Sequence, residues 1–171
     1  DIPDLIAIMD EGIWPAYGGA TALMINGADG AIMAENQIGC FVVSSPVVYD
    51  IDKDGYDEAI ISTNQYDCSF RYSEDTLSPE EIRHELISLD YQTGQMKVLD
   101  VSAGFKNIFS TPWLGDLDGD NYLDIIYAQF YNPQDLQKFL GMSVKRISTA
   151  VPIMAPVRWG AYMGQHGTGI Y

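Results

Sequence analysis

Short apolar runs rich in β-branched and aromatic residues recur along the chain, separated by turns rich in glycine, aspartate and asparagine. Runs of this length and composition, bounded by such turns, are typical of β-strands. Two runs joined by a glycine-containing turn are typical of a hairpin. The pattern predicts strands at residues 5–9, 22–26, 31–37, 41–49, 59–63, 86–90, 95–101, 108–114 and 125–130.

The strands recur because the sequence itself repeats. Residues 44–61 align without gaps with residues 110–127, at an offset of 66. Upstream of each copy, residues 23–30 align with residues 87–94, at an offset of 64. Two matched segments in the same order indicate a true internal repeat rather than a chance similarity.

A third, partial copy opens the chain, where residues 1–8 match residues 55–62. This copy begins in the middle of an acidic loop, so the first ligands of that loop are missing. We therefore expect further sequence upstream of Asp1.

Four short strands in each period of about 65 residues are typical of a propeller blade. The expected fold is all-β, with about two and a half four-stranded antiparallel blades that carry metal-binding loops. Because propellers close with roughly four to eight blades, the chain is expected to be one partial propeller unit. Its repeats are expected at about 1–54, 55–120 and 121–171, although residues 132–142 depart from the repeat pattern.

One segment carries helix signals instead. Ser78 is a suitable N-cap, Pro79 occupies the first helical position, and Glu81 follows three residues after the cap. These signals predict a short helix over residues 79–84, with His84 on its surface. The helix lies on an insertion at residues 67–83, for which a solvated excursion is favoured over a binding role.

The acidic residues are concentrated in two loops, with carboxylates at positions 1, 3, 5 and 9. Alternating carboxylates on a tight turn converge, and they repel one another unless a cation lies among them. All-oxygen ligands in a flexible loop favour Ca²⁺ over Mg²⁺, which demands tighter geometry. The predicted ligands are Asp50, Asp52, Asp54 and Glu58 in one loop and Asp116, Asp118, Asp120 and Asp124 in the other, with position-7 carbonyl oxygens from Tyr56 and Tyr122.

An EF-hand begins in a similar way but needs a glutamate at position 12 and a following helix. Position 12 is Ile61 in one loop and Tyr127 in the other, and both lie in predicted strands. The EF-hand is therefore excluded, while acidic turns without metal remain the alternative. Asp57, at position 8, is expected to face solvent, and Asp4 would belong to a third, partial site.

The acidic loop preceded by Ser-Ser-Pro or Ser-Thr-Pro, and followed by an apolar strand, resembles the FG-GAP or VCBS repeat of integrin-like propellers. The resemblance covers about residues 1–130, and the turn at residues 89–94 also resembles quinoprotein-type propellers. It implies two structural calcium ions in an extracellular, cell-surface or periplasmic protein. The implied partners are the remaining blades of the same protein or another protein chain.

Charge narrows the classes of partner. The 171 residues include 24 acidic against 9 basic side chains, for a net charge of −15. Nucleic acids and anionic membranes attract basic surfaces, so neither is expected as a partner, and no apolar stretch is long enough for membrane insertion. The two cysteines, Cys40 and Cys68, form either one disulfide or two buried thiols.

The leading hypothesis is a non-catalytic module serving adhesion, interaction or assembly. The alternative is part of a propeller-type enzyme, a polysaccharide lyase or quinoprotein-like dehydrogenase, with its active site mostly in other blades. A quinoprotein would be supported by adjacent cysteines near its cofactor, but Cys40 and Cys68 are not adjacent. A lyase cleft needs basic residues, and these are sparse in this chain. Carbohydrate is a further candidate partner, through the aromatic residues Trp14, Tyr17, Trp113, Trp159 and Tyr162, although packing is favoured for these rings.

Overall fold

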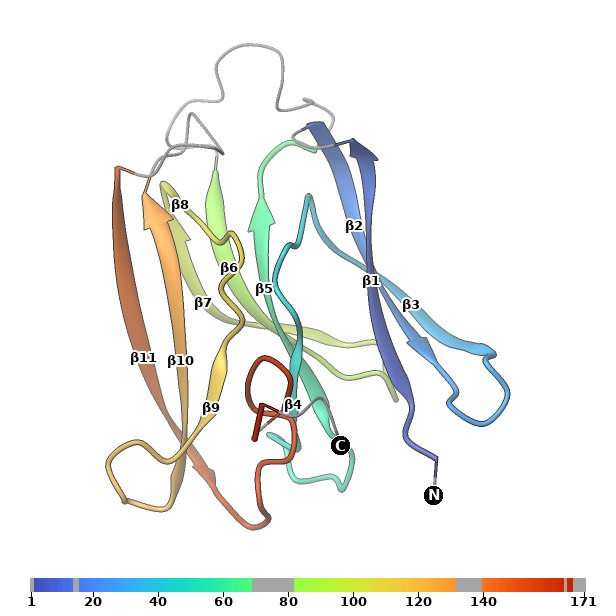
Figure 1. Ribbon diagram of the computed structural model, residues 1–171, viewed down its shortest axis with the longest axis vertical. Helices are drawn as coiled ribbons and strands as arrows, with labels where there is room; N and C mark the ends of the chain where they lie inside the picture. The colour runs from blue at the N-terminus through green and yellow to red at the C-terminus, as the bar shows by residue number, and fades with distance from the viewer. Residues whose placement is uncertain (1, 14–15, 69–81, 132–139, 165, 168–171) are drawn as a thin grey trace.

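The computed structural model describes residues 2–13, 16–68, 82–131, 140–164 and 166–167. These residues form eleven strands and no helix, arranged in three antiparallel sheets (Figure 1). The prediction of an all-β fold is therefore confirmed. Neither a closed barrel nor a closed propeller is formed by the described residues.

Each sheet is built from strands that are close in sequence. The first sheet has the order β1 (Leu5–Ile13), β2 (Ala16–Ile25) and β3 (Ile32–Gly39). The middle sheet has the order β4 (Val47–Tyr49), β5 (Glu58–Gln65), β6 (Arg83–Leu89) and β7 (Met96–Ala103). In the third sheet, β10 (Tyr122–Tyr131) pairs with β11 (Gly141–Pro152) on one side and with the two short strands β8 (Phe105–Lys106) and β9 (Trp113–Gly115) on the other.

The two predicted hairpins have matching turns. Between β2 and β3, the Gly30 N–H donates to the Asn26 carbonyl at 2.8 Å, and between β6 and β7 the Gly94 N–H donates to the Asp90 carbonyl at 2.8 Å. Both glycines have positive φ, 76° and 71°, which a side chain would strain. The repeat seen in the sequence is therefore also a repeat of backbone conformation.

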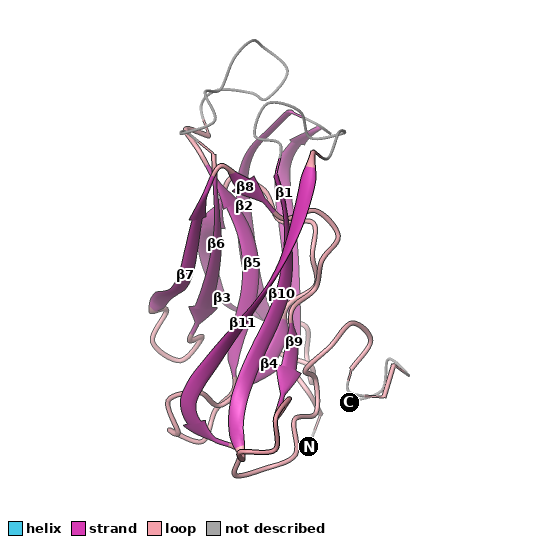
Figure 2. Cartoon of the chain, turned by 90° about the vertical axis from the view of Figure 1, so that its left-hand side faces the viewer, coloured by secondary structure: helices cyan, strands magenta, loops and turns pink. Residues whose placement is uncertain are grey.

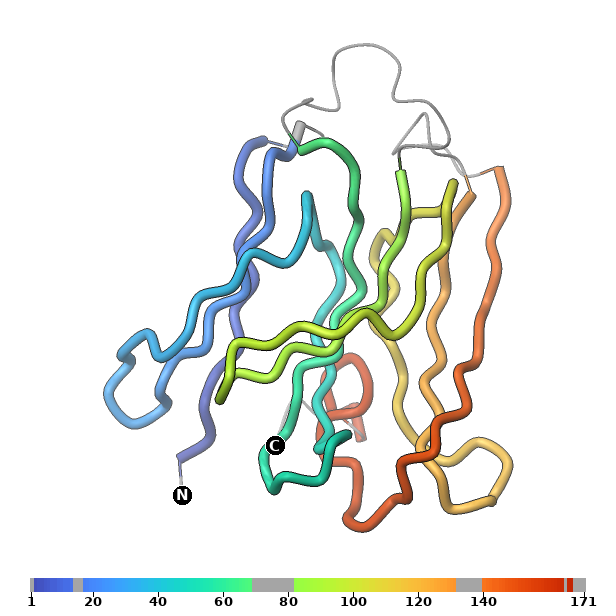
Figure 3. Tube along the Cα trace, turned by 180° about the vertical axis from the view of Figure 1, so that it is seen from behind, coloured from blue at the N-terminus to red at the C-terminus, as the bar shows by residue number. Residues whose placement is uncertain are grey.

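The middle sheet lies between the first and third sheets (Figures 2 and 3), and its strands β5 and β6 are buried, whereas its edge strand β7 is largely exposed. One cluster joins its Ile61 and Ile87 to Ala22 and Ile38 of the first sheet. Because side chains alternate along a strand, its Ile60 points the other way, into a second cluster with Leu123, Ile125 and Tyr127 of the third sheet. The almost continuous burial of β5 and β6 follows from this double contact.

Two predicted strands are shorter than expected. Within residues 41–49 only Val47–Tyr49 is a strand, and within residues 108–114 strand β9 covers only Trp113 and Leu114. The sequences Ser-Ser-Pro and Ser-Thr-Pro precede these strands, and proline has no N–H for a sheet ladder. Side chains satisfy the backbone there instead, as where Val42 N donates to Asp10 Oδ1 at 2.9 Å.

The helix predicted at residues 79–84 is wrong where the structure describes it. Residues 79–81 lie outside the described part of the chain, but Arg83 and His84 are the first residues of strand β6. The expected surface position of His84 is also wrong, because its side chain is fully buried. Pairing of β6 with both β5 and β7 outweighs the local helix signals.

Two strands of the third sheet are not anticipated by the sequence. Strand β8 is only two residues long, and β11 lies in a region without a match in the repeat. Lys145 of β11 points towards the middle sheet, where it contacts Asp100. Because a charged residue occupies an inward position, β11 lacks the alternation of apolar inward and polar outward residues that marks a strand in a sequence. The predicted repeat boundaries at 54/55 and 120/121 fall inside the acidic loops, between two strands of one sheet.

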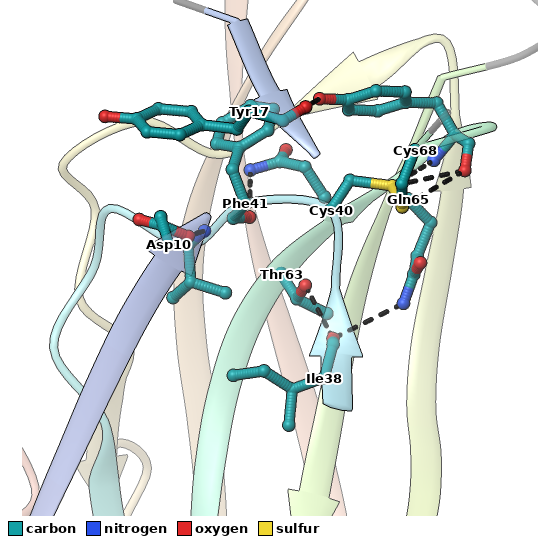
Figure 4. The surroundings of a disulfide bond; sticks show 11 residues. Asp10, Tyr17, Ile38, Cys40, Phe41, Thr63, Gln65 and Cys68 are labelled. Carbon is teal, nitrogen blue, oxygen red and sulfur yellow. Dashed lines mark hydrogen bonds between the residues drawn. A yellow bond between two sulfur atoms is a disulfide. The ribbon is translucent and has the colours of Figure 1, made fainter. Parts of the chain in front are cut away.

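A disulfide joins Cys40 to Cys68, which decides between the two alternatives for these cysteines (Figure 4). It ties the segment after β3 in the first sheet to the segment after β5 in the middle sheet. Hydrogen bonds support the same junction, since Thr63 Oγ1 donates to the Ile38 carbonyl at 2.8 Å. The ring of the buried Phe41 stacks on Tyr17 with centroids 5.9 Å apart.

Candidate metal centres

Both acidic loops lie at the same end of the molecule (Figure 1). One joins the paired strands β4 and β5, and the other joins the paired strands β9 and β10. In the middle sheet, Asp50 Oδ1 accepts from Lys53 N at 2.6 Å and Asp50 Oδ2 accepts from Gly55 N at 3.0 Å. Glu58 Oε2 accepts from Ile51 N at 2.7 Å. One oxygen from each of four side chains lies within 4.8 Å of the others, and these are Asp50, Asp52, Asp54 and Glu58.

The loop of the third sheet repeats these contacts almost bond for bond. Asp116 Oδ1 accepts from Gly119 N at 2.7 Å, and Asp116 Oδ2 accepts from Asn121 N at 2.9 Å. Asp124 Oδ2 accepts from Leu117 N at 3.0 Å, as Glu58 does in the first loop. Here the oxygens within 4.8 Å of one another come from Asp116, Asp118 and Asp120, and Asp124 is outside the group.

The two loops have the same backbone conformation at positions 4 and 6, where their sequences differ. Positions 4 and 6 have positive φ in both, at Lys53 (69°) and Gly55 (97°) and at Gly119 (80°) and Asn121 (65°). Glycine and asparagine tolerate this conformation at little cost. Each loop therefore has one glycine and one other residue, exchanged between the two positions, on the same backbone path.

The ninth position differs in its electrostatics. Glu58 is only 3% exposed, and burial, followed by the charges of Asp52 and Asp50, raises its pKa to about 7. Asp124 is 2% exposed, yet its pKa is lowered, chiefly by a hydrogen bond from Arg146. A positive group is therefore already present at the second loop.

Arg146 was not among the predicted site residues. It lies on β11, and its Nε donates to Asp124 Oδ1 at 2.8 Å while an Nη donates to Asp118 Oδ2 at 2.5 Å. No sequence signal marks it, because β11 has no counterpart in the repeat and Arg146 is 28 residues from Asp118.

The donor sets fit a hard metal ion, since they consist of oxygen atoms only. Seven of the eight predicted carboxylate ligands belong to the two convergent groups, and the position-9 residues Glu58 and Asp124 lie in strands β5 and β10 at the ends of the loops. Asp57, at position 8, belongs to neither group. Tyr56 and Tyr122, predicted to offer backbone oxygens, occupy equivalent places beside Asp54 and Asp120, each donating its N–H to the preceding aspartate at 2.8 Å.

The third, partial site remains a prediction. Asp4 Oδ1 accepts from Gly27 N at 3.0 Å, so this carboxylate stabilises the turn after β2. Asp1 lies outside the described residues.

Polar side chains also meet inside the molecule, between the middle and third sheets. His84 Nε2 lies 2.5 Å from Ser62 Oγ, and the imidazole packs on Tyr127 with centroids 5.1 Å apart. Tyr127 donates to Asp100, which pairs with Lys145 Nζ at 2.6 Å. Burial lowers the pKa of His84 to about 4, with Asp100 and Lys145 acting in opposite directions on it.

This shift predicts a loss of stability in mild acid. Below pH 6.5 the unfolded chain takes a proton on His84 that the folded chain resists, so stability falls as the pH falls towards 4. Between pH 7 and pH 5, the free energy of unfolding should fall by about 2 kcal/mol more in the wild-type protein than in His84→Gln. Urea unfolding at fixed calcium concentration measures this difference. The exposed His166→Gln is the control, and equal pH profiles for wild type and His84→Gln would contradict the prediction.

The aromatic candidates for sugar stacking are dispersed. Tyr17 packs on Phe41, and its carbonyl accepts from Tyr66 Oη at 2.9 Å, which favours packing. Trp113 pairs with Ile126 across the third sheet and is partly buried. Tyr162 is exposed, and Trp14 lies outside the described residues.

A scan against protein-family models finds no match to this chain, and searches of curated proteins and of solved structures also find no match. Among the described residues, no helix has the length and apolar character needed to cross a membrane.

Proposed function

We propose that the protein is a calcium-binding β-propeller repeat module without catalytic activity, serving adhesion, interaction or assembly outside the cell. The observation that carries this proposal is the equivalence of the two acidic loops. They share carboxylate positions, positive-φ positions and the hydrogen bonds that aim the carboxylates. Conformational identity of this kind supports a common ligand for both loops.

Calcium is the metal that this donor set favours. Ca²⁺ accepts six to eight oxygens in irregular geometry, whereas Mg²⁺ retains water and requires an octahedron. In each loop, the position-1 carboxylate accepts from three backbone N–H groups through both of its oxygens, so it is oriented before an ion binds. The proposed ligands are the carboxylates of the two loops with backbone oxygens at Tyr56 and Tyr122.

The arrangement of the sheets supports a propeller. A four-stranded antiparallel sheet in sequential order, whose strands β5 and β6 pack on the sheets of both neighbouring repeats, has the form of a blade. The two outer faces carry exposed apolar side chains, such as Leu5 (58% exposed) on β1 and Val144 (62%) on β11. Further blades, from the same protein or from another chain, would bury these faces.

The disulfide supports an extracellular, cell-surface or periplasmic location. Disulfides persist in oxidising compartments and are rare in the cytosol. Calcium is also abundant enough outside cells to fill weak loops. The net charge of −15 is consistent with binding cations rather than nucleic acid.

The titratable groups that could serve catalysis have structural surroundings, and this supports the proposal that the module is not an enzyme. The Ser62–His84 pair is buried between two sheets, where no substrate can reach it. The carboxylates of the loops are committed to backbone N–H groups and converge as ligands. Carbohydrate remains a candidate partner through exposed aromatic rings such as Tyr162.

Calcium titration of two matched variants tests the proposal. Asp52→Asn removes one charge and a proposed ligand of the first loop, whereas Asp57→Asn removes the same charge at position 8, which is not a proposed ligand. Isothermal titration calorimetry should show one bound calcium fewer in Asp52→Asn and the wild-type stoichiometry in Asp57→Asn. Absence of calcium binding to the wild-type protein at millimolar concentration would refute the proposal.

A further inference from the structure

Arg146 brings a positive charge of the protein itself into the second acidic loop. Its guanidinium contacts Asp124 Oδ1 at 2.8 Å and Asp118 Oδ2 at 2.5 Å. Asp124 is almost fully buried, and its other oxygen already accepts from Leu117 N at 3.0 Å. Both oxygens of this carboxylate are therefore occupied by donors from the protein.

Among the described residues, the place in the middle sheet that corresponds to Arg146 holds no cation. Arg158 lies near the first loop, but the carboxylate on which its charge acts is Asp57, outside the convergent group. Arg146 pairs with Ile126 across strands β10 and β11. The repeat places Ile60 at the position of Ile126, and Ile60 pairs with Ser88 on β6. A serine hydroxymethyl group has neither the length nor the charge to replace a guanidinium.

This pairing, together with the shorter side chain of Asp124 compared with Glu58, accounts for a difference in how the carboxylates converge. All four carboxylates of the first loop bring an oxygen within 4.8 Å of the others, whereas in the second loop only three do so. The one that does not is Asp124, the buried partner of Arg146. A charge-assisted pair with arginine is directional and holds its carboxylate in a set orientation.

We propose that Arg146 is a built-in competitor of calcium at the second loop, so that the two loops fill at different calcium concentrations. This inference rests on the proposed function, in which both loops bind calcium. A Ca²⁺ ion ligated by Asp118 and Asp124 must displace the guanidinium of Arg146. The ion needs the oxygens that the guanidinium contacts, and the two positive groups repel each other. The first loop fills first, and the second fills only when Arg146 turns away towards solvent.

Calcium titration of Arg146→Ser tests the competition, because serine is the residue at the equivalent place in the middle sheet. Wild type should bind two calcium ions with distinct affinities, and the weaker class should tighten roughly tenfold in the variant. Asp118→Asn should remove the weaker class and Asp52→Asn the tighter one. Arg83→Ser is the matched control, since it removes the same side chain from a pair with Glu85, away from both loops.

Thermal unfolding separates competition from a merely structural role. Without calcium, Arg146→Ser loses two ion pairs and should melt a few degrees below wild type. In saturating calcium the variant should melt at or above the wild-type temperature. Arg146→Met, which keeps the apolar stem of the side chain, provides a second variant if the serine variant does not fold.

The possible results distinguish this inference from the proposal beneath it. Equal affinities of the two wild-type loops, unchanged in Arg146→Ser and Arg146→Met, would overturn the competition while leaving calcium binding intact. A melting temperature lowered equally with and without calcium would also overturn it. If neither loop of any variant binds calcium, the proposed function itself fails.

Discussion

Removing calcium from both loops should lower the melting temperature by roughly 10–20 °C. A ligand that binds only the folded state at 100 times its Kd stabilises it by about 2.7 kcal/mol per site. For a chain of this size, each 1 kcal/mol changes the melting temperature by roughly 2–4 °C. The effect should be large because each loop packs several carboxylates within 4.8 Å of one another, and their repulsion is relieved by the ion.

Differential scanning calorimetry with excess chelator, and then with calcium restored, measures this change. Magnesium at the same concentration should restore only part of the stability, because its octahedral geometry does not fit the loops. The double variant Asp52→Asn/Asp118→Asn should show a much smaller response. Identical melting temperatures in chelator and in calcium would contradict metal binding at these loops.

Removing the disulfide should destabilise the fold by about 3 kcal/mol, and lower the melting temperature by roughly 10 °C. The bond closes a loop with a sequence separation of 28 residues, which restricts the unfolded chain. It also ties the first sheet to the middle sheet, where Cys40 is fully buried beside Phe41 (Figure 4). Cys40→Ala/Cys68→Ala avoids placing an unpaired hydroxyl in that interior.

Calcium stoichiometry is the control for the disulfide variant. The loops lie in the middle and third sheets, away from the bond, so the double variant should still bind two ions. Reductant should shift the wild-type melting temperature by a similar amount and leave the variant unchanged. If wild-type protein that is unfolded and refolded in reductant melts at the same temperature as the oxidised protein, the bond does not stabilise the fold.

The carboxylate loops could be read from the sequence because their geometry is local. Asp50 is held by the N–H groups of Lys53 and Gly55, only three and five residues away. A repeat of such spacing at Asp116 therefore predicts the same loop. The hairpin turns at Asn26 and Asp90 are equally local, which is why the strands on either side of them were predicted correctly.

Other features depend on contacts that have no sequence signature. The helix signals at residues 78–81 and the surface position expected for His84 are both local inferences. Strand β6 is instead held between β5 and β7, with the imidazole inside the interface of two sheets. Burial between sheets depends on which face of a strand its neighbours cover, and spacing along one strand does not reveal that.

By itself, the sequence determined the all-β class, the repeat, and the two sets of carboxylates, because turns and alternating strands are set by interactions a few residues apart. Only the tertiary structure decided the pairing of Cys40 with Cys68, the burial of His84 and the position of Arg146. Each of these depends on the packing of one sheet against another or on pairing with β11, which brings together residues far apart in the chain. Thus the two loops have similar local sequences, with Glu58 in one and Asp124 in the other at position 9, and a neighbouring strand adds a further difference, where the middle sheet has Ser88 and the third has Arg146.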